Sequence, residues 1–265
     1  MLDVEFEQLS DRGRVRQNNE DYLGCSLPET PAQVRSRGWL FALADGVGGH
    51  AQGEVASRAA VESLLAGFCA SGGELHTSLL PRLVQAANAQ VYETGSTAGP
   101  EAAGMSTTLV ACGLRFNRAV VAHVGDSRCY LLRSGRSTAL TRDHTVASEQ
   151  TRLGLLSEKE AAEANTRHVL SRSLGSNLFV SVDISDHQLL RGDVLVLCSD
   201  GLHGAVTAEE MAHTVAHTVD LKAAAGRLVA LANERDGSDN VSVQLIRVRQ
   251  VERVGMYRGR PYKLR

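Results

Sequence analysis

The strongest constraint on the fold is a series of short segments, rich in β-branched and apolar residues, that recur along the chain with turn-forming residues between them. The connections at 114–120 and 131–140 are short enough to be β-hairpins, which pair neighbouring strands antiparallel. We therefore expect antiparallel sheets. The predicted strands are residues 40–45, 106–114, 118–126, 129–133, 180–184, 193–200 and 240–248.

Helical periodicity occurs in separate blocks of the chain. Apolar residues follow the i, i+3, i+4, i+7 pattern over 61–68 and again over 80–87. A third helix is predicted to begin at Thr207, because Glu210 stands where a capping box requires an acid, and a fourth covers 221–232. Hairpins with few strand–helix–strand alternations favour an α+β fold in which helices cover the outer faces of antiparallel sheets.

Composition limits the classes of partner and compartment. The 265 residues are 43% hydrophobic and carry 28 basic and 30 acidic side chains, a net charge of -2, which argues against binding to nucleic acid or an anionic membrane. The five cysteines show no CxxC spacing, and the N-terminus lacks the pattern of a signal peptide. No apolar run approaches about 18 residues. We expect a cytoplasmic protein with no membrane segment.

Two regions differ from the rest. Residues 141–176 are polar, charged and helix-prone, and they interrupt a strand-rich region, so we interpret them as an excursion over a site. Residues 250–265 follow the last predicted strand and carry five Lys and Arg against one Glu. We expect one domain over 1–248, with 141–176 as an insertion and 249–265 as a loosely attached basic tail.

Carboxylates stand at the predicted strand ends, each beside a small or turn-forming residue. An isolated Asp in that position usually shapes a turn or caps a helix. Several that converge would repel one another and attract divalent cations, and oxygen ligands without a His or Cys cluster favour Mg²⁺ or Mn²⁺. These acids are Asp45, Asp126, Asp200 and Asp239, with a further pair at Glu20 and Asp21.

Arg16 lies in the polar segment just before Glu20 and Asp21. An Arg in a polar loop is usually only solvated, but a guanidinium is also the best bidentate partner for two phosphate oxygens. The nearby acids favour the second interpretation.

Eight motifs in this order resemble the metal-dependent PP2C (PPM) protein phosphatases, and in detail their bacterial serine/threonine branch. They span about residues 5–248 and read "SDRGRVRQNNEDYLG", "LFALADGVGGHAQGEVAS", "GMSTTLVACGL", "VAHVGDSRCYLL", "LTRDHT", "LSRSLGS", "LVLCSDGLHGAV" and "DGSDNVSVQLIRV". The resemblance implies a four-layer α-β-β-α sandwich of two antiparallel sheets flanked by helices. Residues 141–176 occupy the place of the family's flap subdomain, and we call them the flap.

The resemblance also implies a centre of two Mn²⁺ or Mg²⁺ ions, with a possible third, at one end of the sandwich. In the family pattern Asp45 bridges the two ions, and the carbonyl of Gly46 binds one of them. Asp200 and Asp239 complete the other. Asp126 with Asp200 matches the acids of the third, weaker site.

Three further residues match the family's catalytic positions. Arg16 matches the arginine that grips the substrate phosphate, and Glu20 and Asp21 match acids that hold metal-bound waters. The implied activity is hydrolysis of phosphoserine and phosphothreonine by a metal-activated water. A monomer that opposes a bacterial Ser/Thr kinase is the expected context.

One departure concerns the proton for the leaving group. Val47 stands where eukaryotic members carry a histidine proposed as general acid, so the proton must come from elsewhere. His50 and His144 are the nearest candidates by sequence, although a structural role is favoured for both. The alternative to an enzyme is a catalytically silent module of the same fold that binds a phosphoprotein or a kinase. Lost metal ligands would be its signature, and none is missing.

Overall fold

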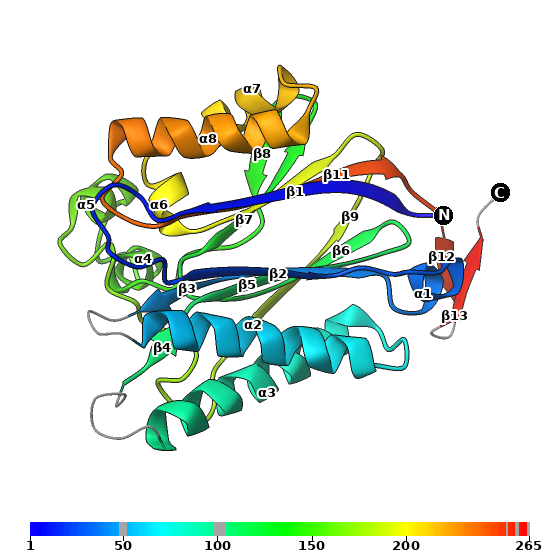
Figure 1. Cartoon of the computed structure of the whole chain (residues 1–265), viewed down its shortest axis with the longest axis horizontal. Helices are drawn as coiled ribbons and strands as arrows, with labels where there is room; N and C mark the ends of the chain where they lie inside the picture. The colour runs from blue at the N-terminus through cyan, green and yellow to red at the C-terminus, as the bar shows by residue number, and fades with distance from the viewer. Residues whose placement is uncertain (48–51, 98–103, 253, 258–259, 264–265) are drawn as a thin grey trace.

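The computed structural model describes residues 1–47, 52–97, 104–252, 254–257 and 260–263, and its centre is a pair of stacked β-sheets (Figure 1). In the first sheet all neighbouring strands are antiparallel, in the order β1-β11-β10-β7-β8. These strands are β1 (Asp3–Asp11), β11 (Val241–Gln250), β10 (Val194–Cys198), β7 (Arg128–Arg133) and β8 (Arg136–Ala139).

The second sheet is also antiparallel, in the order β2-β3-β5-β6-β9, with β4 paired to the end of β3. Its strands are β2 (Asp21–Ser26), β3 (Trp39–Val47), β4 (Ser106–Thr107), β5 (Leu109–Arg115), β6 (Arg118–Val124) and β9 (Asp183–Gln188). The strand predicted over 106–114 is therefore divided at Thr108, whose N–H and hydroxyl both hydrogen-bond to Asp45 instead.

Successive side chains of β3 point alternately toward the other sheet and toward the helices, which shows how the layers pack. Phe41 and Leu43 lie in the core between the two sheets, whereas the intervening residues face the helices. Phe41 is fully buried, and its ring contacts that of Phe6 from β1 edge-on, with 5.2 Å between centroids. The inter-sheet layer thus joins strands that are distant in sequence.

Helices cover the two outer faces, which confirms the predicted α+β four-layer sandwich (Figure 1). The second sheet carries α2 (Gly53–Ala70) and α3 (His76–Thr97), and the first sheet carries α7 (Ala208–Ala216) and α8 (Leu221–Arg235). The capping box predicted at Thr207 and Glu210 is present at the start of α7. A short α1 (Pro31–Ser36) joins β2 to β3.

The flap contains two short helices, α4 (Val146–Arg152) and α5 (Glu158–Glu163), and lies at one end of the sandwich (Figure 1). One isolated bridge, between Thr145 and Leu170, lies within the flap, and another, between Thr107 of β4 and Leu174, attaches the flap to the body. The same end of the sandwich contains α6 (Asp200–His203), which directly follows β10.

Sequence patterns missed β1 and β2 and misplaced the strand expected at 180–184, which is β9 at Asp183–Gln188. β1 and β9 are edge strands with much of their surface exposed, so polar residues dilute the apolar signal. β2 contains Gly24, where a Cβ would lie 2.6 Å from Val61 of α2. The glycine weakens the strand pattern but lets the helix approach.

The region after residue 249 contains strands that were not predicted from the sequence. β11 continues to Gln250, and β12 (Val254–Tyr257) and β13 (Arg260–Lys263) form a small antiparallel sheet. Glu252 is buried and forms an ion pair with Arg35 at 3.6 Å. No helix in the described part of the chain is both long enough and apolar enough to cross a bilayer.

Replacing Phe41 with Ala should lower the free energy of unfolding by about 3–5 kcal/mol, because the change leaves a cavity between the sheets. Phe179→Ala is the matched control, since that ring is 77% exposed, and its effect should stay within about 0.5 kcal/mol. Urea unfolding followed by circular dichroism measures both variants. Equal effects would contradict the proposed packing of the core.

Candidate metal centre

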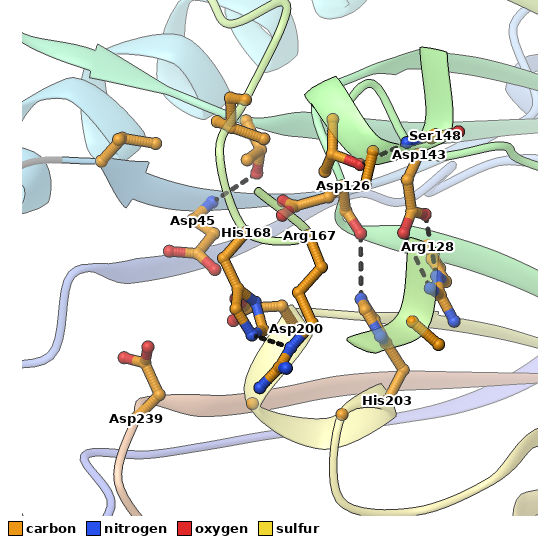
Figure 2. A pocket seen from close by; sticks show the side chains of 18 of the residues that line it. Asp45, Asp126, Arg128, Asp143, Ser148, Arg167, His168, Asp200, His203 and Asp239 are labelled. Carbon is orange, nitrogen blue, oxygen red and sulfur yellow. Dashed lines mark hydrogen bonds and ion pairs between the residues drawn. The ribbon is translucent and has the colours of Figure 1, made fainter. Parts of the chain in front are cut away.

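A cavity of about 1480 Å³ lies at the flap end of the sandwich, and its wall includes nearly all of the residues that the sequence predicted for the site (Figure 2). Flap residues form much of the opposite wall, and Arg167 and His168 extend from it toward Asp200 in this view. Of the predicted residues, those that line the cavity are Arg16, Glu20, Asp45, Gly46, Asp126, Asp200 and Asp239.

Strand register explains why the acids converge. Asp45 near the end of β3 is paired directly with Asp21 at the start of β2. Asp126 lies in the turn from β6 to β7, Asp200 begins α6 after β10, and Asp239 immediately precedes Asn240 and β11. Because the sheets are antiparallel and stacked, these starts and ends of strands meet at one end of the molecule.

Burial and mutual repulsion dominate the electrostatics of this cluster. Burial raises the pKa of Asp21 and that of Asp126 to about 7, and the charge on Asp200 adds to both shifts. Burial also raises the pKa of Asp45 well above its usual range, with Asp21 and then Asp200 contributing repulsion. The pKa of Asp200 is raised by burial and by Asp239. The carboxylates therefore lack sufficient compensating positive charge.

Asp21 was predicted to share the site; it is the cross-strand partner of Asp45 but does not itself line the cavity. Ser199 donates a hydrogen bond to Asp21 Oδ2 at 2.8 Å, while Oδ1 is buried without a hydrogen-bond partner. Asp200 Oδ1 is likewise buried and unpartnered. Two carboxylate oxygens thus have unused acceptor capacity next to the cavity.

Gly46 lies where no side chain fits. A Cβ at this position would collide with the backbone of Gly53 at the start of α2. The Gly46 N–H donates to the Glu20 carbonyl at 3.1 Å, so the end of β3 contacts both the N-terminal loop and α2. The glycine is therefore required by the close approach of three backbone segments.

The structure brings Arg16 and Asp239 together, a contact that sequence reasoning did not foresee. Arg16 Nη2 donates to Asp239 Oδ2 at 2.7 Å, and both side chains are partly exposed at the cavity. The predicted phosphate-binding cation is thus already oriented by a predicted metal ligand.

Asn240, the residue after Asp239, holds the N-terminal loop through three hydrogen bonds. Its Oδ1 accepts from the Glu20 N–H at 2.8 Å, and its Nδ2 donates to the carbonyls of Arg12 and Asn18 at 2.9 and 3.0 Å. Buried side-chain amides that satisfy three backbone groups position a loop firmly. The position of Glu20 therefore depends on Asn240.

The burial of His144 agrees with the structural role favoured for it from the sequence, and a different histidine lines the cavity. His144 is completely buried, so it cannot reach a leaving group, and His50 lies outside the described residues. His203, which the sequence reading did not single out, lines the cavity and donates from Nε2 to the Asp126 carbonyl at 2.9 Å (Figure 2). Burial and the nearby Arg128 lower the pKa of His203 to about 4, so its ring is neutral at neutral pH.

The donor set fits a hard divalent cation. Within the described ranges, no group of three His, Cys, Asp or Glu side chains has the geometry of an enclosed metal site. The raised pKa values and the unpartnered oxygens of Asp21 and Asp200 nevertheless show that positive charge would stabilise the cluster. All the donors are oxygens, which suits Mg²⁺ or Mn²⁺.

Comparison with known proteins agrees with this geometry. The family model described as Protein phosphatase 2C matches residues 8–241. The serine/threonine phosphatase stp of Listeria innocua is 34% identical over 259 residues, which are 96% of this chain and 98% of the relative. The crystal structure of the Mycobacterium tuberculosis serine/threonine phosphatase PstP/Ppp superposes with a TM-score of 0.83 at 33% identity, covering 94% and 100% of the two chains.

A second structure bears on the metal. The catalytic domain of the phosphatase PstP in complex with two manganese ions superposes with a TM-score of 0.81 at 33% identity, covering 94% of this chain and 100% of that one. The similarity therefore extends to a protein that binds the class of cation to which this donor set is suited.

The acid cluster makes a prediction about pH. Between the unfolded-state pKa of about 3.9 and the folded value of about 7, folded Asp21 binds more protons than unfolded Asp21, so its contribution to stability is lost as pH rises. In protein treated with chelator, Asp21→Asn should therefore gain stability relative to wild type between about pH 5 and pH 8.

Urea unfolding at both pH values measures this gain, and the exposed Asp3→Asn at the other end of the molecule serves as the surface control. A difference between Asp21→Asn and wild type that does not change with pH would contradict the electrostatic account.

Proposed function

The chain belongs to the protein phosphatase 2C family, and on this premise we propose that it is a metal-dependent phosphatase of phosphoserine and phosphothreonine in proteins. The observation that supports this most directly is the meeting of Asp45, Asp126, Asp200 and Asp239 with Arg16 around one cavity. A cluster of acids alone would serve a cation, but the guanidinium beside it suits a phosphate.

We assign the metal ligands as the sequence predicted. Asp45, the carbonyl of Gly46, Asp200 and Asp239 would hold two Mn²⁺ or Mg²⁺ ions, and Asp126 with Asp200 would hold a third. When bound, such ions activate water near neutral pH and neutralise charge on the phosphate. Asp21 is the cross-strand partner of Asp45, and its unpartnered Oδ1 is an acceptor for water.

Arg16 binds the phosphate in this proposal. Its contact with Asp239 orients the guanidinium at the cavity before substrate arrives, and the planar fork can then donate to two phosphate oxygens. Glu20, held through its N–H by Asn240, is the acid that orients water on the same side. The proton for the leaving Ser or Thr oxygen does not come from Val47 or from the buried His144.

The proposal also covers the catalytic unit, the substrates, the oligomeric state and the cellular location. Residues 1–248 act as the catalytic unit, and its substrates are phosphorylated proteins, including those of a Ser/Thr kinase that the enzyme opposes as a monomer. A cytoplasmic location is supported by the cysteines, which are all free, with Cys112, Cys129 and Cys198 fully buried.

Hydrolysis of p-nitrophenyl phosphate with Mn²⁺ tests the proposal. Asp45→Asn and Asp239→Asn should abolish the Mn²⁺-stimulated rate, because each removes an anionic donor. Arg16→Lys should lower kcat/KM about 10- to 100-fold, since a hydrogen bond to a charged group contributes about 1.5–3 kcal/mol. Arg82→Lys is the matched control, because Arg82 forms an exposed pair with Glu74 at 2.8 Å and does not line the cavity.

Wild-type protein loaded with Mn²⁺ that is no faster than Asp239→Asn would overturn the proposed activity. If that protein still bound a phosphothreonine peptide, the silent binding module would be the better description.

A further inference from the structure

We propose that His144 is a positioning residue that couples the flap to the turn carrying Asp126. This inference rests on the proposed function, because the flap forms a wall of the same cavity as the metal-binding acids. His144 was first considered as a proton donor, and its complete burial assigns it a different role.

On one side His144 holds both backbone groups of Gly125, the residue before Asp126. The Gly125 N–H donates to His144 Nδ1 at 3.1 Å, and the His144 N–H donates to the Gly125 carbonyl at 2.7 Å. Gly125 has a φ of 109°, and a Cβ there would lie 2.6 Å from Thr108. The turn is thus confined to one conformation that only glycine adopts easily.

On its other side His144, which itself belongs to the first part of the flap, contacts the last part of the flap and the strand that follows it. Its Nε2 lies 3.2 Å from Asp183 Oδ2 at the start of β9, and its carbonyl accepts from the Ser171 N–H at 2.8 Å. Asp183 pairs with Arg172 at 2.9 Å, and Arg172 pairs with Glu149 of helix α4 at 3.3 Å. A continuous chain of polar contacts therefore runs from α4 to Gly125.

An imidazole is suited to both contacts at once. Burial lowers the pKa of His144, so the ring is neutral at neutral pH. Because Nδ1 accepts the Gly125 N–H, the ring proton is on Nε2 and faces Asp183. The tautomer is set by the two neighbours, and neither ring nitrogen is available for chemistry in the cavity.

Asp126 is held from the opposite side by His203, which donates to its carbonyl from the helix that Asp200 begins (Figure 2). The turn therefore lies between α6 and the base of the flap. A displacement of the flap by a bound phosphoprotein would reach Asp126 through His144, whereas a small substrate that does not contact the flap would not produce it.

Two amide substitutions separate the contacts of His144. The amide of His144→Asn can place an acceptor near the position of Nδ1 and keep the contact with Gly125, whereas His144→Gln reaches toward Asp183 and leaves the Gly125 N–H without its acceptor. Asp183→Asn weakens the flap contact alone. His76→Gln is the matched control, a buried histidine on α3 that contacts the Arg37 carbonyl at 2.8 Å, far from the cavity.

Three measurements test these variants: steady-state kinetics on p-nitrophenyl phosphate and on a phosphothreonine peptide, calorimetric titration with Mn²⁺, and hydrogen exchange of residues 124–127. We expect His144→Gln to lower kcat about 10-fold on both substrates, weaken Mn²⁺ binding and speed exchange of the turn. His144→Asn and Asp183→Asn should keep kcat on p-nitrophenyl phosphate within about 2-fold and raise KM for the peptide about 3-fold or more. His76→Gln should change thermal stability only.

Equal behaviour of His144→Gln and His144→Asn, or of His144→Gln and His76→Gln, would overturn the proposal. If the His144 variants do not fold, Asp183→Asn tests the proposal alone. An unchanged KM of Asp183→Asn for the peptide would then reject the coupling. A wild-type protein inactive on both substrates would instead refute the proposed function, and hydrogen exchange of the turn would still report whether His144 holds it.

Discussion

The repulsion among partly buried carboxylates at one end of the sandwich is the constraint on which the rest of the site depends. Asp21 and Asp45 are placed opposite each other by strand pairing in the second sheet. Asp200 follows β10 of the first sheet, and Asp126 lies in the turn from β6 to β7, which connects the two sheets at the same end. Such an arrangement is unfavourable for folding by itself, because burial and like charge both oppose ionisation. It persists because a large core between and outside the sheets stabilises the scaffold, and because a cation can relieve the repulsion.

The scaffold positions these acids with backbone contacts more than with side-chain pairs. Asn240 holds the N-terminal loop, Gly46 allows three segments to approach one another, and His144 and His203 hold the turn of Asp126 from two sides. These contacts fix the backbone from which the acids project, so each carboxylate starts from a defined position at the cavity. The flap takes part through the same kind of contact between His144 and Gly125, and this contact is the basis of the coupling that we propose between the flap and the turn of Asp126.

Much of the fold could be predicted from local pattern. The interior strands β3, β5, β6, β7, β10 and β11 are apolar enough to recognise, and the helices around Leu64, Leu83 and Leu228 have clear apolar stripes. β1 and β2 were not predicted, because β1 is a polar edge strand and β2 is short and contains Gly24. The strands β12 and β13 in the tail were not predicted. The basic composition of this segment indicates neither the burial of Glu252 nor the pairing of two short strands.

By itself the sequence determined the chemical identity of the site: acids at strand ends, glycine beside Asp45, and Arg16 near Glu20 and Asp21. These are properties of residue type and local order, and they hold whatever the distant parts of the chain do. Only the tertiary structure decided that Arg16 pairs with Asp239, 223 positions away, that Asp21 does not line the cavity, and that His144 is completely buried. Each of those outcomes depends on strand register and on the stacking of two sheets, which arise from the packing of the whole chain and leave no local trace in its sequence.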